Sequence, residues 1–479
     1  MTLKQKAVSG IKWTGVSMAV VTALQFITLA VLARYLAPFD FGLMGMIMVV
    51  MGFAQAFADM GISNAIIHRQ DATRDQLSSL YWLNMLVGVL VFCIIWASTP
   101  LVVIFYREPR LYDLLHITAV IFLITPVAQQ FQILLQKNLN FNGLAKIEMA
   151  TALVNSTVSI GAGMASLGVY ALVYGQLAGT IARVALLCGV GWRDWHPSLH
   201  FSRRDLKGYV SFGLYQMGER TVNYLSAHMD YIIIGRFLGP AALGFYTLAY
   251  QLVTFPLTKV NPVITKVIFP VFSIIQNDNE SFRKGYVRVI NYIAFITFPM
   301  LIGLFIVAPE FIILLFGERW VASAFVLQIL CMVGLFKSLG NPVGAVLLAK
   351  GRADIGFYWN VFIMIIVGVA VIIGVNWGIN GVAIAILLLQ IPLFLIIQPI
   401  VNRLIDLKMI QYLKPLFTPL VCSLAMLAGI FLVKRVVVES DAQRVFAISV
   451  TVGVLIYTAA LYIKDKNSFW EVVSLIKGN

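Results

Sequence analysis

Charged side chains are scarce in this 479-residue sequence. Asp, Glu, Lys and Arg together make up 12% of it, whereas hydrophobic residues make up 60%, and the mean hydropathy is +0.89. Soluble globular domains carry about 25% charged residues, because their surfaces face water. The composition therefore excludes a soluble domain and predicts a chain that lies mostly within a membrane.

Cysteine is also rare. The four cysteines are Cys93, Cys188, Cys331 and Cys422, and each stands alone inside an apolar segment. Disulfide frameworks and zinc sites need cysteines in pairs or at ligand spacing. We therefore expect neither a disulfide nor a metal site.

Long polar segments and nucleotide-binding motifs are missing from the sequence. The longest predicted connections, 192–209 and 276–288, are too short to form a soluble catalytic domain. The sequence contains no P-loop, GxSxG, HExxH or glycine-rich dinucleotide motif. These absences argue against a pump with its own ATPase and against an enzyme. Transport remains as the class of function, with no cofactor expected.

Apolar runs of roughly 20 residues, the length that spans a bilayer as a helix, fill the chain. We predict an all-α integral membrane protein with about fourteen transmembrane helices. Their ranges are 13–34, 41–62, 79–104, 113–135, 147–166, 170–191, 211–235, 242–270, 289–315, 321–348, 355–375, 379–401, 414–434 and 445–463.

The net charge of +14 fits the positive-inside rule. With the N-terminus in the cytoplasm, most of the 35 Lys and Arg residues fall in cytoplasmic connections. This distribution places both termini in the cytoplasm, and no nucleic-acid partner is needed to explain the charge.

One phrase occurs twice. RYLAPFDFG runs from Arg34 to Gly42 and RFLGPAALG from Arg236 to Gly244, a shift of 202 residues (236 minus 34). LLQK at 134–137 and LLAK at 347–350 echo each other in the same order. The repeats predict two parallel six-helix lobes related by an axis along the membrane normal.

The repeats also predict the domain organisation. We expect an N-terminal lobe at 1–192, a cytoplasmic interfacial linker at 193–209, a C-terminal lobe at 210–402 and two additional helices with a tail at 403–479. The linker mixes aromatic and basic residues, which suits anionic lipid headgroups. Arg34 and Arg236, at the periplasmic turns, are expected to be gate residues and headgroup anchors.

Polar residues within the seventh and fourth spans mark a candidate substrate cavity. Each set follows a 4, 3, 4 spacing, which places its members on one face of a helix. The alternatives are packing near the headgroups for the seventh span and interhelical hydrogen bonding for the fourth. The first set is Glu219, Asn223, Ser226 and Asp230, with Arg220 beside it, and the second is Thr125, Gln129, Gln132 and Gln136.

Charges at membrane depth give further candidates, since a buried charge is costly and usually faces the bundle interior or water. Cations suited to a diphosphate are Arg183, Lys259, Lys266 and Lys337, although Lys266 can instead extend to the headgroups. Carboxylates suited to proton or sodium coupling are Asp59, Glu219 and Asp230.

Several segments resemble a known family in its order and spacing. They include ARYLAPFDFG, FADMGISNAIIHR at 57–69, FYREPRL at 105–111, LLQKNLNF at 134–141 and NYLSAHMDYIIIGRFLG at 223–239. The chain resembles the polysaccharide transporter family, the Wzx-type oligosaccharide flippases of the multidrug/oligosaccharidyl-lipid/polysaccharide exporter superfamily. Ala37 and His228 depart from the family pattern, where Gly and Asn are usual.

The resemblance implies a flippase in the bacterial inner membrane, similar to colanic acid and related exopolysaccharide exporters. Such proteins move undecaprenyl-diphosphate-linked oligosaccharide units to the periplasmic leaflet for exopolysaccharide, capsule or O-antigen synthesis. Membrane lipids and the polymerase and chain-length machinery are the implied partners. Two alternatives stay open: a drug/cation antiporter of the same superfamily, and an integral-membrane polysaccharide polymerase or ligase.

Overall fold

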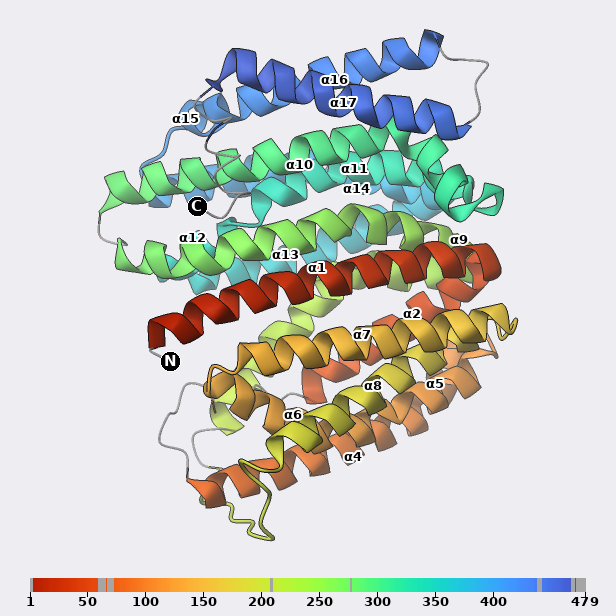
Figure 1. Cartoon of the computed structure of the whole chain (residues 1–479), viewed down its shortest axis with the longest axis vertical. Coiled ribbons are helices and arrows are strands. Elements are labelled where there is room, and N and C mark those ends of the chain that lie inside the picture. Colours follow the sequence, from red (N-terminus) through yellow and green to blue (C-terminus); the bar gives the residue numbers. More distant parts are fainter. Residues whose placement is uncertain are drawn as a thin grey trace. The chain divides into compact units, whose positions relative to one another are not determined.

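A computed structural model describes residues 3–58, 66, 73–206, 210–275, 278–436, 442–466 and 470. Every regular element in these ranges is a helix, so the predicted all-α class is confirmed (Figure 1). The chain forms two compact units, Met1–Gly244 and Phe245–Asn479, and each is described by itself.

The first unit holds the helices that precede α9 and the first part of α9. α4 begins with a capping box, in which Thr73 and Gln76 satisfy each other's backbone amides. The helices are α1 (Leu3–Tyr35), α2 (Pro38–Ala58), α4 (Arg74–Tyr106), α5 (Leu111–Ala119), α6 (Ile121–Lys137), α7 (Phe141–Met164), α8 (Tyr170–Gly191) and α9 (Val210–Ile274).

The second unit holds the rest of α9 and all later elements. They are α10 (Asn279–Phe316), η1 (Glu318–Trp320), α11 (Ala322–Gly340), α12 (Val343–Ala349), α13 (Ala353–Val375), α14 (Gly378–Leu404), α15 (Met409–Leu413), η2 (Lys414–Leu416), α16 (Phe417–Val436) and α17 (Ala442–Lys464).

Twelve stretches within the described residues are long and apolar enough to cross a membrane, which makes this a multi-pass membrane protein. α7 is not among the twelve, and α9 contributes a single stretch, Arg220–Phe255. α9 leaves helical geometry at two residues. His228 lies inside the predicted seventh span, and Gly239, where φ is +80°, lies between the predicted seventh and eighth spans. The predicted count of fourteen stays a prediction.

The two copies of the repeated phrase pack against each other within the first unit. A Cβ on Gly42 would lie 1.7 Å from the carbonyl oxygen of Pro240, and a Cβ on Gly244 would lie 1.7 Å from the carbonyl oxygen of Pro38. Only glycine permits such an approach of two backbones. The contact joins the first part of α9 to this unit, whereas the predicted lobe boundary lies at 193–209. The lobe division by repeat stays a prediction.

A side chain from another helix compensates the first proline of α10. Pro299 has no amide hydrogen, so the helix leaves the carbonyl of Phe295 without its usual donor. The hydroxyl of Tyr457 in α17 donates to that carbonyl at 2.8 Å. Because a backbone group without a partner is costly in a membrane, this bond helps to hold α17 on α10.

A side chain from another helix also compensates the second proline of α10. Pro309 frees the carbonyl of Phe305, and the side-chain amide of Gln328 in α11 donates to it at 3.1 Å. One residue further, Glu310 forms an ion pair with Lys434 of α16 at 2.7 Å. The two prolines of α10 therefore mark points of attachment for three other helices.

Candidate substrate cavity

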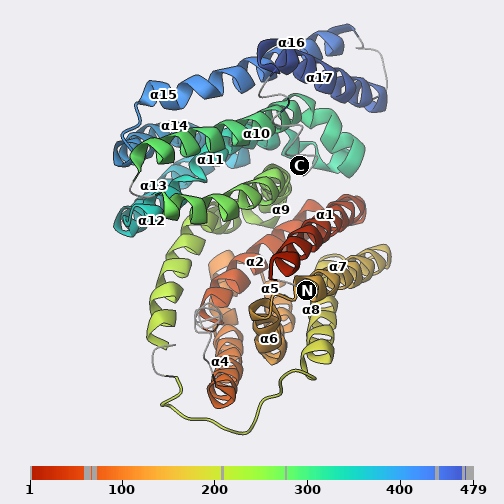
Figure 2. The same cartoon turned by 60° about the vertical axis from the view of Figure 1, so that its left-hand side comes forward.

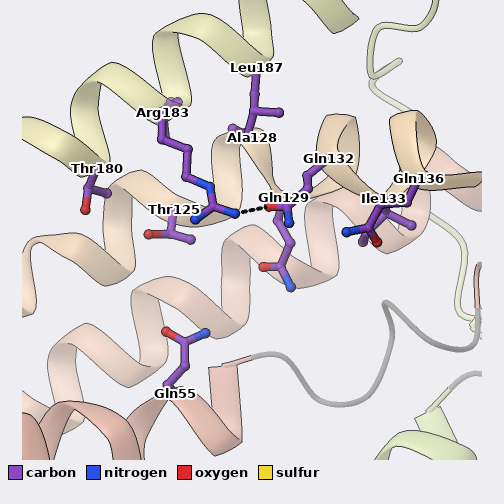
Figure 3. A pocket seen from close by; sticks show the side chains of 11 residues that line it. Gln55, Thr125, Ala128, Gln129, Gln132, Ile133, Gln136, Thr180, Arg183 and Leu187 are labelled. Carbon is purple, nitrogen blue, oxygen red and sulfur yellow. Dashed lines mark hydrogen bonds between the residues drawn. The ribbon is translucent and has the colours of Figure 1, made fainter. Parts of the chain in front are cut away.

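A polar cavity of about 460 Å³ lies within the first unit, between α2, α6 and α8 (Figure 3). Seven of its lining residues carry polar or charged side chains, in a bundle whose buried residues are mostly apolar. The lining residues are Gln55, Thr125, Ala128, Gln129, Gln132, Ile133, Gln136, Thr180, Arg183, Val184 and Leu187.

α6 supplies most of the polar lining because of its residue spacing. Thr125, Gln129, Gln132 and Gln136 all line the cavity, as the 4, 3, 4 pattern requires for one helix face. The opposite side of α6 packs against α4, where Phe131 and Leu135 enter an apolar cluster with Tyr81 and Leu80. Packing on one side thus directs the amides to the other.

Arg183 is the charged member of the described lining. It lies eight residues before the end of α8 at Gly191, about 12 Å at the helical rise. Its Nη2 donates to Oε1 of Gln132 at 3.0 Å (Figure 3). That bond uses one of the two lone pairs of the Gln132 carbonyl oxygen and directs the amide, so the amide nitrogen remains as a donor for a ligand.

The arrangement is rich in donors. A guanidinium has five N–H groups and remains charged at any physiological pH, while amides and hydroxyls can both donate and accept. Among the described lining residues there is no carboxylate. The cavity is therefore suited to an anionic or hydroxyl-rich ligand rather than to a cation.

The structure does not place the seventh-span candidates in this cavity. Asp230 is buried and accepts a hydrogen bond at 2.9 Å from the backbone amide of Tyr231, next to the irregular His228. Arg220 is half-buried and Asn223 is exposed. The side chains of Glu219, Lys259 and Lys266, and the whole of Asp59, lie outside the described residues.

The remaining predicted cations lie elsewhere. In the second unit, exposed Lys337 has its Nζ 3.4 Å from the hydroxyl of Tyr250 and 5.0 Å from the centre of that ring. In the first, Arg236 lies over the ring of Phe105 at 5.8 Å, and Arg34 is exposed at the end of α1.

Two lining residues, Gln55 and Thr180, are not among the site residues predicted from the sequence. Gln55 lies in the predicted second span, and Thr180 lies one turn before Arg183 on α8. The spacing of three between Thr180 and Arg183 was a usable signal, because it places both on one face. Gln55 lies four residues before Asp59 in the predicted second span, so this spacing also places two polar residues on one helix face.

The second half of the chain does not repeat this polar set. The repeat offset of 202 carries Gln55 to Leu257, which is 7% exposed. The offset of 210 between LGVYALV at 167–173 and WGINGVA at 377–383 (377 minus 167) carries Arg183 to Leu393, which is 4% exposed. At the positions of Gln55 and Arg183 the two halves therefore differ, whereas the same offset of 210 carries Thr180 to Gln390, which is also polar.

A helical membrane bundle with a polar, cation-bearing cavity is the architecture of a membrane transporter. Residues 31–325, more than half of the chain, match the family described as "Polysaccharide biosynthesis protein". The chain belongs to this family, which confirms the resemblance seen in the sequence.

Curated relatives cover nearly the whole chain. It is 38% identical over 459 residues to the teichuronic acid biosynthesis protein TuaB of Bacillus subtilis, covering 95% of each. It is 34% identical over 431 residues to the lipopolysaccharide biosynthesis protein WzxC of Escherichia coli, covering 88% of this chain and 87% of that protein.

Solved structures share the fold at low identity. The lipid II flippase MurJ, in an inward closed conformation, superimposes with a TM-score of 0.77 at 15% identity, covering 95% of this chain and 98% of that one. An inward-facing multidrug MATE transporter gives a TM-score of 0.61 at 16% identity, covering 80% and 96%. These likenesses establish the fold.

Proposed function

We propose that this protein is a flippase that translocates undecaprenyl-diphosphate-linked oligosaccharide repeat units across the bacterial inner membrane. The units would serve exopolysaccharide, capsule or O-antigen synthesis. The observation that carries the proposal is the cavity of about 460 Å³, with Arg183 and four glutamines inside an apolar bundle.

The cavity chemistry matches such a headgroup. Glutamine amides and threonine hydroxyls exchange hydrogen bonds with sugar hydroxyls, and the Arg183 guanidinium attracts an anionic group. Cavities of about 300–1,000 Å³ hold small ligands, so this one accommodates part of an oligosaccharide headgroup. The polyprenyl tail would stay in the bilayer.

The relatives support the same assignment. Two carry names for the biosynthesis of anionic or lipid-linked surface polymers, teichuronic acid and lipopolysaccharide. A third, 22% identical over 362 residues, is named a succinoglycan biosynthesis transport protein, ExoT, of Rhizobium meliloti. Export of a surface polysaccharide precursor is the activity that unites these names.

Transport would proceed by alternating access of two lobes, with both termini in the cytoplasm. The contact between the two repeated phrases supports a periplasmic gate near Arg34 and Arg236. Arg220, Asn223, Lys259 and Lys337 would contact the headgroup at other stages of the cycle. Asp59, Glu219 and Asp230 are proposed as coupling carboxylates, and the burial of Asp230 supports its part. Membrane lipids and the polymerase and chain-length machinery are the proposed partners.

A cation antiporter is the second candidate. It requires carboxylates or aromatic rings that attract a cation, and the described lining of the cavity has neither. Arg183 would repel a cationic drug from this cavity. The chemistry therefore favours the anionic substrate.

Deletion of the gene tests the proposal. Loss of a flippase should stop the surface polysaccharide and leave one complete lipid-linked repeat unit on the cytoplasmic leaflet. Normal polysaccharide together with altered drug tolerance would instead favour the antiporter.

A further inference from the structure

The cytoplasmic segment 192–206 is folded tightly onto the start of α4. We call it the clasp. The backbone amides of Ser198 and Ser202 donate to the hydroxyl oxygens of Ser78 and Ser79 at 3.2 and 3.1 Å. The indole of Trp82 donates to the carbonyl of Ser198 at 2.8 Å. These bonds fix the backbone of the clasp against one helix.

An aromatic side chain and a carboxylate complete the inner side of the clasp. Trp195 is 5% exposed and lies 5.9 Å from the ring of Tyr81 and 5.7 Å from the ring of Phe131. Asp205 accepts from the Ser79 hydroxyl at 2.8 Å. Trp195 belongs to the same apolar cluster as Leu187, which lines the cavity. The clasp thus supports the cavity wall from behind.

With its polar backbone turned inward, the clasp presents mainly apolar and basic side chains outward, with Asp194 as an exposed acidic residue among them. Leu199 is 93% exposed, and Phe201 and Trp192 are 50% and 55% exposed. The arginines of the clasp, Arg193, Arg203 and Arg204, are exposed as well. In both Figure 1 and Figure 2 this yellow-green segment passes along the outer side of the start of α4. Exposed leucine and phenylalanine beside arginines are typical of a surface that meets a lipid interface.

The length of α4 fixes the depth of the clasp. Its 33 residues span about 50 Å, whereas the hydrocarbon core of a bilayer is about 30 Å thick. About 10 Å at each end of α4 therefore lies beside headgroups. Ser78 and Trp82 follow the first residue, Arg74, by four and eight positions, about 6 and 12 Å. The clasp is held at headgroup level and not above the membrane.

We propose that the clasp binds the cytoplasmic leaflet, with Leu199 and Phe201 inserted at the acyl boundary and Arg193, Arg203 and Arg204 on anionic headgroups. Arginine donors pair with lipid phosphates, and each basic residue near an anionic surface adds to the attraction. The segment that leads from α8 towards α9 is thereby tied both to α4 and to the membrane.

Spin labels on the full-length protein in nanodiscs test this surface. In a background in which the four cysteines are replaced, a label is placed at Leu199→Cys or at Phe201→Cys. Its accessibility to oxygen and to a water-soluble nickel chelate is measured in discs of phosphatidylcholine with and without phosphatidylglycerol. Leu90→Cys, at the exposed middle of α4, gives the bilayer reference, and Glu280→Cys gives the water reference.

We expect both clasp labels to be shielded from the chelate at least threefold relative to Glu280→Cys, and more so with phosphatidylglycerol. The charge reversal Arg203→Glu/Arg204→Glu should restore access of the chelate to the Leu199 label, whereas Arg203→Lys/Arg204→Lys should not. The lipid comparison uses unaltered arginines, so misfolding of the reversal variant cannot explain the result. Water-like access at both labels in either lipid would overturn the proposal and favour a soluble protein partner. If the shielding of the labels from the chelate is the same with and without phosphatidylglycerol and is unchanged by the charge reversal, the proposed role of the arginines is overturned.

Discussion

Arg183 on α8 donates a hydrogen bond to Gln132 on α6 over 3.0 Å, and the pair joins two walls of the cavity. Arg183 supplies positive charge to the described lining, and Gln132 fixes the direction of its guanidinium. We predict that Arg183→Ala lowers transport at least tenfold and that Arg183→Lys restores only part of it, because an ammonium lacks the planar fork. Export of the surface polysaccharide in a deletion strain measures both.

The bond between Arg183 and Gln132 predicts that substitutions of the two residues have non-additive effects on transport. If Gln132 acts by positioning Arg183, then Gln132→Ala should lower transport in the wild-type background and have little further effect in Arg183→Ala. The matched control is Arg444→Ala in α17, which removes an exposed arginine outside the cavity and outside the clasp and should leave the cavity function unchanged. Equal effects of Gln132→Ala in both backgrounds would show that the two side chains act independently.

The bond from Gln328 to the Phe305 carbonyl predicts that the cost of losing Gln328 depends on Pro309. Gln328→Leu should leave the Phe305 carbonyl without a donor and cost about 1–3 kcal/mol. In a Pro309→Ala background, the restored backbone amide can bond to that carbonyl, so Gln328→Leu should cost little. Thermal unfolding of the four proteins in one detergent measures the cycle, and an equal cost in both backgrounds would refute the compensation.

The close contact between Gly42 and the Pro240 carbonyl predicts that alanine at position 42 destabilises the protein. Gly42→Ala should destabilise the protein by about 1–3 kcal/mol or more, because the new Cβ meets the Pro240 carbonyl. Gly161→Ala is the control: a Cβ there has no neighbour within 4 Å, and alanine favours the helix. Equal melting temperatures for Gly42→Ala and the wild type would contradict the contact.

The lowered pKa of Asp205 predicts that the clasp loses stability in acid. Hydrogen bonds from the Ser79 hydroxyl and the His200 ring hold the pKa of Asp205 below its usual value. A lowered folded-state pKa stabilises the clasp above the unfolded pKa of about 3.9, and this stability is lost as the pH falls through the folded-state pKa. Hydrogen exchange of the Ser198 and Ser202 amides, corrected for intrinsic rates, should increase in acid.

Asp205→Asn provides the comparison. Its clasp should be less protected at neutral pH and should show no added loss of protection as the pH falls from about 3.9, the usual aspartate pKa, through the lower folded-state pKa of Asp205. Identical pH profiles in the two proteins would assign the acid response to other groups.

Local pattern predicted some of these features and not others. Hydropathy and length indicated the helices, and the spacing of Thr125, Gln129 and Gln132 placed them on one face, because both signals are properties of a single helix. The bond between Arg183 and Gln132 joins two helices 51 residues apart, and no local signal records it. The burial of Trp195 likewise depends on Phe131, so an aromatic that composition would place at the membrane surface lies in the interior.

The central claim is that the cavity of the first unit carries a lipid-linked oligosaccharide across the bilayer. The most direct measurement is translocation of a purified undecaprenyl-diphosphate oligosaccharide in proteoliposomes, followed by the access of a membrane-impermeant enzyme to its sugars. We predict protein-dependent translocation that Arg183→Ala abolishes and Arg444→Ala, at an exposed position of α17, retains. Translocation equal to that of protein-free liposomes, or equal in wild type and Arg183→Ala, would contradict the account.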